Sequence, residues 1–411
     1  MIQGYNIVCI GSQDWHAHLN VPQQTMKRLA ACNRVLYVNL PRTPLRLVLG
    51  DGGGYSARRK KRLEVIRVDD DCLWLYSPPA LFVPANGLPG RVSLAATQLN
   101  GHILARLLRG VTSNLMFDAP LLWIYAFGGA PLLGKISARL TVYDCIDDWP
   151  GYLPNGTTRE NVSRLDSTLC RAADLVFVGS KPLLAARRDL NPETHWVPHA
   201  ADFSHFSLAA SEHTPIPADI SGIPRPIVGL IGMLEKRVDL DILSHLAGAR
   251  PEWSIVLVGP VWNSLDISSL QRHRNVHFLG MKPVAELPGY LKAFDVCMVP
   301  YVLDDFTRAI YPLKLHEYLA SGKPIVSTRI PAIAEHEELI YIADGPQEFA
   351  GAVHRALGER DPQLSRRRIQ LASQNTWEDR VARKSALVEK LLARRSGAAA
   401  SMTDNKRDWS T

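Results

Sequence analysis

The sequence predicts an α/β protein with two domains, each built on a parallel β-sheet whose strands are joined by crossover helices. Short runs rich in Val, Ile and Leu alternate with longer helical patterns from end to end. This alternation restarts after a proline-containing stretch near the middle of the chain. A chain of 411 residues with 46% apolar and 21% charged residues has the size and composition of a two-domain globular protein.

The strand-like runs fall into two series. The first comprises residues 6–10, 34–38, 63–68, 121–125, 140–143, 175–178 and 195–197. The second comprises residues 227–231, 254–258, 276–279, 296–299, 324–327 and 339–342. Between the series, prolines interrupt a stretch with little apolar periodicity. We therefore predict a domain at residues 1–206, a linker at 207–225 and a second domain at 226–375.

The end of the chain has the pattern of a helix followed by a tail. Thr376 can cap a helix, and Asp379 stands three residues later, where its carboxylate can reach the cap amide. Trp377, Val381 and Val388 then share one helix face. We predict a helix over 376–395 that crosses back to the first domain, and a disordered tail over 396–411.

Composition and charge exclude several classes of protein. The six cysteines form no C-x-x-C pair, which argues against a disulfide framework or a structural zinc. A net charge of +7 favours an anionic partner, but no aromatic-plus-basic pattern indicates nucleic-acid binding. No segment has the roughly 18 apolar residues of a membrane-spanning helix. Residues 1–11 lack the pattern of an export signal, so we expect a cytoplasmic protein.

The densest group of chemical signals lies at residues 312–327. The pattern predicts a helix that ends at Gly322 and leads directly into a buried strand. Lys314 and Glu317 stand one turn apart at its start, where helices offer free amides to phosphate. The ammonium can neutralise phosphate oxygens, and the carboxylate can accept two vicinal ribose hydroxyls. The alternative is a solvated ion pair between residues i and i+3.

This segment resembles the donor-site helix of nucleotide-sugar-dependent glycosyltransferases of the GT-B type, in particular the family 4 or group 1 set. The other segments that match are 197–203, 231–232, 275–280, 286–291, 294–301 and 377–380. The resemblance covers most of residues 140–390. It implies two Rossmann-like domains facing a central cleft, with the nucleotide-sugar donor in the second domain and the acceptor in the first. It also implies that no metal cofactor is required.

The candidate donor-binding residues are Gly232, Lys236, Arg237, Arg308, Lys314, Leu315 and Glu317. Two positions depart from the family pattern. Ala309 replaces the glutamate that the family commonly has eight residues before Glu317, so the contact with the donor sugar must differ. Met233 and Leu234 replace the usual arginine after the glycine loop. The cation that holds the diphosphate is therefore open among Lys236, Arg237, Arg308 and Lys314.

The first domain should hold the acceptor. An apolar strand leads into Asp144, Asp147, Asp148 and Trp149 at the strand end that faces the expected cleft. Asp147 or Asp148 could take the proton from an acceptor hydroxyl, and Trp149 could stack on a sugar. Asp144 could contact the acceptor or cap the next turn.

The loop after the first strand supplies further candidates. Asp14 and Trp15 could contact the acceptor. His16 is a candidate catalytic residue, since it or His18 could reach phosphate or acceptor, although a single loop histidine is often a bystander.

Two other patterns in the chain bear on partners. The basic run 58–62 and the apolar loop 80–84 suit peripheral docking on an anionic membrane, at the inner face of the cell membrane, or are solvated turns. The pairs Asp69/Asp71 and Asp239/Asp241 spell D-x-D, but a turn and a helix start explain them without a metal.

We therefore expect a glycosyltransferase that moves a sugar from a nucleoside diphosphate to a hydroxyl of a glycan or lipid-linked glycan, in bacterial polysaccharide biosynthesis. The resemblance favours retention of anomeric configuration, whereas inversion would need a base such as Asp147 or Asp148. Two alternatives are a non-hydrolysing nucleotide-sugar epimerase and a catalytically silent nucleotide-sugar-binding subunit, the latter suggested by Ala309.

Overall fold

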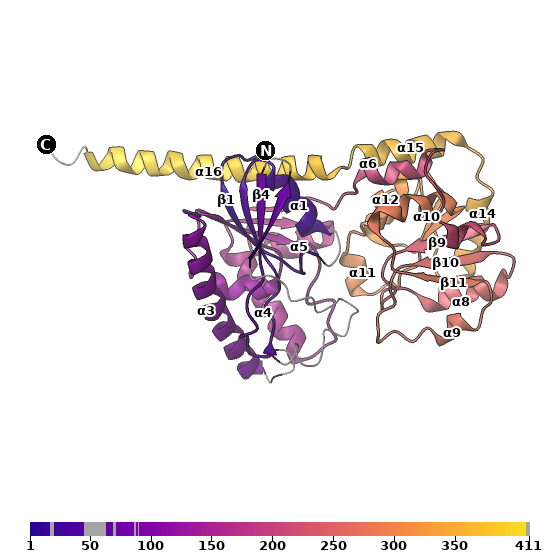
Figure 1. Cartoon of the computed structure of the whole chain (residues 1–411), viewed down its shortest axis with the longest axis horizontal. Coiled ribbons are helices and arrows are strands. Elements are labelled where there is room, and N and C mark those ends of the chain that lie inside the picture. Colours follow the sequence, from indigo (N-terminus) through magenta and orange to yellow (C-terminus); the bar gives the residue numbers. More distant parts are fainter. Residues whose placement is uncertain (17–19, 45–62, 69–70, 86–87, 89, 408–411) are drawn as a thin grey trace. The chain divides into compact units, whose positions relative to one another are not determined.

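The computed structural model describes residues 1–16, 20–44, 63–68, 71–85, 88 and 90–407 (Figure 1). The chain divides into two compact units. Unit 1 comprises Met1–Pro198 and Glu378–Thr411, and unit 2 comprises His199–Trp377. Each unit is a sheet with helices on its faces, which confirms the predicted α/β class with two parallel sheets.

Unit 1 contains an eight-stranded sheet in the order β3-β4-β2-β1-β5-β6-β7-β8. The strands are β1 (Asn6–Ile10), β2 (Arg34–Val38), β3 (Leu63–Val68), β4 (Asp71–Tyr76), β5 (Leu121–Ile124), β6 (Leu140–Cys145), β7 (Leu175–Val178) and β8 (Thr194–Trp196). Neighbouring strands are parallel except for the antiparallel pair β3 and β4. The sequence predicted every strand but β4, whose start was interpreted as a turn.

The longer helices of unit 1 cover its sheet. They are α1 (Val21–Ala30), α3 (Gly90–Asn114), α4 (Thr157–Ala172), α5 (Lys181–Arg188) and α16 (Trp377–Arg407). α3 and α4 pack their apolar side chains on one face of the sheet, where Leu108 and Leu169 join a core with Leu36 and Leu122. Arg28 of α1 donates to Glu378 of α16 at 2.7 Å.

Unit 2 contains a six-stranded, fully parallel sheet in the order β11-β10-β9-β12-β13-β14. The strands are β9 (Ile227–Ile231), β10 (Ser254–Val258), β11 (Val276–Gly280), β12 (Val296–Val299), β13 (Ile325–Ser327) and β14 (Tyr341–Ile342). Its longer helices are α8 (Leu240–Ala249), α10 (Leu287–Ala293), α12 (Lys314–Ala320), α14 (Pro346–Leu357) and α15 (Pro362–Ser373). β9, β10 and β12 are buried along their whole length, as expected for strands covered on both faces.

The stretch 207–225 differs from the predicted linker, since it belongs to unit 2. It forms a 3₁₀ helix (Ser207–Ala210) and α7 (Ala218–Ser221). Lys292 of α10 donates to the carbonyl of Thr214 at 2.8 Å, and the Tyr290 hydroxyl donates to Asp219 at 2.8 Å. These contacts fasten the stretch to α10, and the division between the units falls after Pro198.

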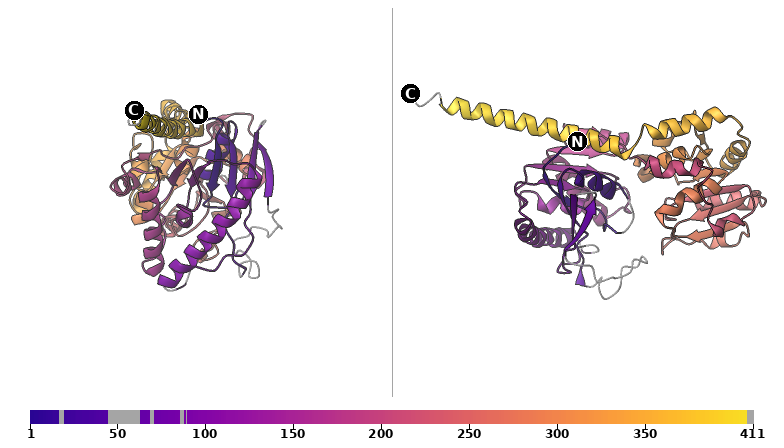
Figure 2. Two further views of the ribbon diagram at one scale, coloured as in Figure 1. Left: turned by 90° about the vertical axis from the view of Figure 1, so that its left-hand side faces the viewer. Right: turned by 45° about the horizontal axis from the view of Figure 1, so that its top comes forward.

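The predicted disordered tail is also wrong over residues 396–407. Helix α16 continues to Arg407 and is uninterrupted in Figure 2. The stretch after 395 contains no proline and several alanines, so its local preference does not end the helix there. None of the helices in the described ranges is long and apolar enough to cross a bilayer.

Candidate functional site

The loop after β9 lies at the carboxyl edge of the unit 2 sheet, where the strand order reverses between β9 and β12. Gly232 in this loop has a φ of 152°, in the region that favours glycine. A Cβ on Gly259, just after β10, would lie 1.9 Å from the Gly232 carbonyl oxygen. Glycine is therefore required at both positions, and the sheet edge presents backbone without side chains.

Helix α12 brings the predicted ion pair to this loop. A Cβ added at Gly232 would lie 3.1 Å from Lys314 Cε. Lys314 Nζ donates to Glu317 Oε2 at 2.8 Å, and the two side chains are 20% and 14% exposed. The ammonium has further donors and the carboxylate has a second oxygen, so both groups can also bind a ligand. The partial burial distinguishes this pair from a solvated surface pair.

Tyr318, which the sequence analysis did not select, holds α12 against β9. The Ile231 amide donates to the Tyr318 hydroxyl oxygen at 2.8 Å. Burial raises the pKa of Tyr318 well above its usual value, so the hydroxyl stays neutral. The sequence feature that could have identified Tyr318 is a tyrosine four residues after Lys314, on a helix face that is otherwise apolar.

Arg237 lies farther along the same loop and is held by three groups. Its guanidinium forms an ion pair with the buried carboxylate of Glu235. It also lies over the rings of Tyr301, at 5.8 Å, and Phe306, at 5.9 Å. These contacts fix Arg237 beside helix α11 (Asp305–Ala309), from which Arg308 extends as an exposed cation.

The structure thus assembles part of the predicted donor set. Gly232, Lys314 and Glu317 are neighbours, and Arg237 lies beside the helix that carries Arg308. Lys236 is exposed on the loop between them. The Leu315 side chain is fully buried, so it packs in the core instead of facing a ligand. The Leu315 amide donates to the Pro312 carbonyl at 3.1 Å.

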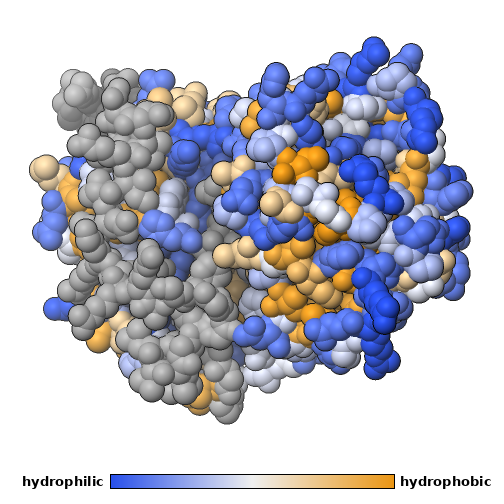
Figure 3. All heavy atoms as spheres, turned by 45° about the vertical axis from the view of Figure 1, so that its right-hand side comes forward, coloured by the Kyte–Doolittle hydropathy of each residue, from blue (hydrophilic) through white to orange (hydrophobic). Residues whose placement is uncertain are grey.

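Apolar side chains also reach the surface at this edge of the sheet. The exposed large apolar residues of unit 2 are Leu208, Ile216, Trp262, Met281, Val284 and Val302, and apolar surface is visible in Figure 3. Trp262 follows β10, is 49% exposed, and donates its amide to the Leu234 carbonyl at 2.8 Å. Met281 follows β11 and is 60% exposed. The loops after β10 and β11 therefore place the aromatic ring of Trp262 and the thioether of Met281 at the same sheet edge as the Gly232 loop after β9.

In unit 1 the structure corrects the role expected for Asp144. This residue is buried in β6, and its Oδ2 accepts from Trp123 Nε1 at 3.1 Å and from Lys384 Nζ of α16 at 2.5 Å. Its carboxylate is occupied inside the fold, so Asp144 does not face an acceptor. It instead joins the last helix to the sheet.

The loop after β1 packs tightly on the neighbouring strand. The Tyr37 hydroxyl donates to the Gln13 carbonyl at 2.8 Å, and the Trp15 ring lies 5.0 Å from the Tyr37 ring. Asp14 accepts from Arg42 at 3.0 Å. Asp14 and Trp15 are therefore engaged in holding this loop. His16 is exposed, whereas His18 lies outside the described residues.

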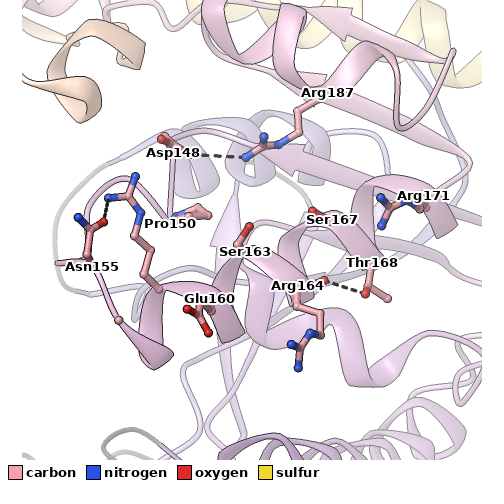
Figure 4. Close-up of a pocket in the computed structure, with 12 residues that line it drawn as sticks. Asp148, Pro150, Asn155, Glu160, Ser163, Arg164, Ser167, Thr168, Arg171 and Arg187 are labelled. Carbon is pink, nitrogen blue, oxygen red and sulfur yellow. Dashed lines mark hydrogen bonds and ion pairs between the residues drawn. The ribbon is translucent and has the colours of Figure 1, made fainter. Parts of the chain in front are cut away.

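Asp147, Asp148 and Trp149 follow β6 and are all partly exposed. Arg187 Nη2 lies 3.5 Å from Asp148 Oδ1 (Figure 4). The same nitrogen lies 2.7 Å from Oδ2 of the buried Asp166. Burial raises the pKa of the Asp166 carboxyl, and the Arg187 guanidinium opposes that rise. Asp148 thus lies at the edge of a network around Arg187 that the sequence analysis did not detect.

Of the two D-x-D pairs, Asp239/Asp241 lies at a helix start as expected, whereas Asp71 begins strand β4 instead of lying in the expected turn. Asp239 caps α8, accepting from the amides of Asp241 and Ile242 at 3.0 Å each. Asp69 and the basic run 58–62 lie outside the described residues. Among the described side chains, no group of three or more His, Cys, Asp or Glu residues could hold a metal ion.

Comparison with known proteins agrees with this architecture. Residues 225–359 match the family described as Glycosyl transferases group 1. TuaH of Bacillus subtilis (strain 168), a glycosyltransferase assigned to teichuronic acid biosynthesis, is 28% identical over 278 residues, which cover 62% of this chain and 68% of TuaH.

Solved structures extend the similarity to nearly the whole chain. Sucrose-phosphate synthase from Thermosynechococcus elongatus superimposes with a TM-score of 0.69 at 16% identity, covering 95% of this chain and 100% of that one. The E. coli structure described as trehalose-6-phosphate bound with UDP-2-fluoro glucose superimposes with a TM-score of 0.66 at 12% identity. The match covers 94% of this chain and 99% of that one. The chain thus has the two-domain GT-B fold, and its residues 225–359 are similar to the group 1 glycosyltransferases.

Proposed function

We propose that the protein transfers a sugar from a nucleoside diphosphate to a hydroxyl of a glycan or lipid-linked glycan. The observation that carries this proposal is the partly buried Lys314–Glu317 pair beside the Gly232 loop. Bare backbone at the carboxyl edge of a parallel sheet admits a diphosphate. A similar structure was determined with UDP-2-fluoro glucose, which supports a donor of this class.

Each donor-site residue has a distinct task in this proposal. Lys314 neutralises the diphosphate, and Arg237 and Arg308 add positive charge. Glu317 accepts the vicinal ribose hydroxyls. Trp262 and Met281 offer apolar surface to the base. The three cations supply the charge that a divalent metal would supply, so we expect activity to persist in excess chelator.

The acceptor is proposed to bind to unit 1, where Asp147, Asp148 and Trp149 are partly exposed after β6. The family resemblance favours retention of configuration, with the donor phosphate assisting deprotonation of the acceptor. The relation to TuaH supports a role in polysaccharide biosynthesis. The alternative is a subunit that binds the donor without transferring the sugar. It is suggested by Ala309, which replaces the glutamate that the family commonly has at this position.

We also propose peripheral contact with an anionic membrane through the loop around Leu81. Leu81 is 59% exposed, whereas Phe82 is buried in the core. Asn100 of α3 accepts from the Val83 amide and donates to its carbonyl, both at 2.8 Å, which fixes the loop on the helix. The loop can thus present Leu81 and Val83 to acyl chains.

The donor assignment is tested by substituting Glu317. The wild type should bind UDP or GDP more tightly than the corresponding 2′,3′-dideoxy nucleotide. Glu317→Gln should remove this preference by weakening the ribonucleotide by about 1.5 to 3 kcal/mol, since a charge-assisted acceptor is lost. Calorimetry measures both affinities. Glu337→Gln, at an exposed ion pair of unit 2, is the matched control and should change neither.

A Glu317→Gln variant that keeps the full preference for the ribonucleotide would refute the ribose role. Wild-type protein that binds donor but transfers no sugar to any of a broad set of acceptors would favour the silent subunit instead.

A further inference from the structure

A groove of about 860 Å³ lies along helix α4 in unit 1 (Figure 4). Side chains of α4 line one side, and Asp148 and Arg187 lie on the other. Four arginines and two carboxylates are among the described residues that line it. Pro150 is the only one of these lining residues with an apolar side chain. The groove is therefore polar and carries a net positive charge.

The charges in the groove differ in how they are already used. Arg187 is committed to Asp166 and Asp148, as described above. Arg159 donates to Asn155 at 2.7 Å. Arg164 and Arg171 are exposed, and no described residue forms a hydrogen bond or ion pair with either guanidinium. These two guanidinium groups are available to a ligand, and Glu160 is the one acidic side chain of α4 among the residues that line the groove.

Helix periodicity arranges the free arginines in a regular row. Arg164 and Arg171 are seven residues apart, so they lie on one face about 10 Å apart along the axis. The hydroxyl groups of Ser167 and Thr168 stand between them. A guanidinium binds carboxylate and phosphate oxygens bidentately, and hydroxyls suit the neutral oxygens of a sugar. This spacing fits an elongated ligand with several negative charges.

We propose that the α4 groove binds an acidic glycan, whose carboxylate or phosphate groups pair with Arg164 and Arg171. The inference rests on the proposed function, because the glycan would be the acceptor or the acidic part of it, and Asp148 is one of the residues that line the groove. A flat anionic bilayer is the less suitable partner, because the site is concave and offers it no exposed apolar side chain.

The test uses calorimetry at low salt with four probes. Oligogalacturonate supplies carboxylates, short poly(glycerol phosphate) supplies phosphodiesters, a maltooligosaccharide of equal length is neutral, and phosphatidylglycerol vesicles represent a bilayer. The wild type should bind at least one acidic oligomer and should bind the neutral one at least tenfold more weakly. Binding of one acidic oligomer alone identifies its charged group, and binding of both indicates recognition by charge.

The double variant Arg164→Gln/Arg171→Gln should bind the acidic oligomer about tenfold more weakly, since two charge-assisted contacts are lost at an exposed site. Arg106→Gln/Arg109→Gln on the exposed face of α3 removes the same charge from the same unit and should leave the affinity unchanged. All variants should keep the wild-type melting temperature and UDP affinity.

Four results would overturn the proposal. They are equal binding of acidic and neutral oligomers, an equal loss in the α3 control, binding of vesicles only, and no binding of acidic oligomers by protein that still binds UDP. Wild-type protein that does not bind UDP would instead contradict the proposed donor site. Binding of the acidic and neutral oligomers would then still test the groove.

Discussion

The first loop of each sheet follows a strand at the same topological position, yet the two loops are built in opposite ways. After β9, Gly232 and Gly259 leave bare backbone beside the Lys314 ammonium. After β1, a Cβ on Gly11 would lie 2.3 Å from the Tyr37 hydroxyl oxygen, and the rings of Tyr37 and Trp15 occupy the corresponding region. In unit 2 the loop after β9 is therefore open and has the Lys314 ammonium beside it. In unit 1 the equivalent loop after β1 is filled by the rings of Tyr37 and Trp15.

The charged pairs repeat this difference. Lys384 and Asp144 in unit 1 are almost completely buried, with side chains 4% and 3% exposed. Lys314 and Glu317 in unit 2 remain in reach of solvent. A buried pair is specialised for structure, because its groups have no access to a ligand, whereas a partly buried pair at an open loop can exchange one partner for a ligand. The loop after β9 thus carries the features of a diphosphate site, and the described part of the loop after β1 does not.

The largest expected effect comes from breaking the buried pair. Lys384→Met leaves the Asp144 carboxylate buried without its cation, which should destabilise the protein by about 3 to 5 kcal/mol. The double variant Lys384→Met/Asp144→Asn should recover part of this loss. Chemical denaturation measures both. Arg394→Met, at an exposed pair with Glu193, should cost less than about 1 kcal/mol. A loss in Lys384→Met no larger than in Arg394→Met would mean that the pair does not anchor α16.

The second largest effect, on UDP affinity, distinguishes the loop after β9 from the loop after β1. Gly259→Ala places a methyl group against the Gly232 carbonyl, and backbone cannot yield cheaply, so UDP affinity should fall by about tenfold or more. Gly11→Ala should disturb unit 1 and leave UDP affinity unchanged. Calorimetry on folded protein provides the comparison. Equal losses in both variants would show that the Gly232 loop has no special part in nucleotide binding.

A smaller effect is expected at the acidic residues after β6. In a retaining reaction assisted by the donor phosphate, Asp147→Asn and Asp148→Asn should each keep transfer within about tenfold of the wild type, since neither acts as the base. A general base contributes about 10² or more, so its loss would be visible in the transfer rate. A fall of that size in one variant, with UDP binding intact, would make that residue the base of an inverting reaction.

Local pattern predicted most of the framework. The apolar runs 227–231 and 296–299 are strands with those bounds, because fully buried strands need continuous Val, Ile and Leu. Lys314 and Glu317 were found because they stand one helical turn apart. β4 was missed because it begins with Asp71, next to other acidic residues. A polar start of a strand resembles a turn when its partner strand is unknown.

Long-range contacts explain the remaining differences. Asp144 had the pattern of a site residue, since its partner Lys384 lies 240 positions away. The role of Tyr318 depends on the amide of Ile231, 87 positions earlier. Arg187, Asp166 and Asp148 come from three separate segments, so no spacing within the sequence joins them.

Substitution of Lys314 tests the central claim most directly. Lys314→Met keeps the length and apolar part of the side chain and removes the ammonium. Calorimetry should show UDP weakened by about 1.5 to 3 kcal/mol and uridine hardly changed, because only the diphosphate loses its cation. Lys27→Met, on an exposed turn of α1 in unit 1, is the matched control and should affect neither ligand. Unchanged UDP affinity in Lys314→Met, or an equal loss for UDP and uridine, would contradict the assignment of the phosphate site to unit 2.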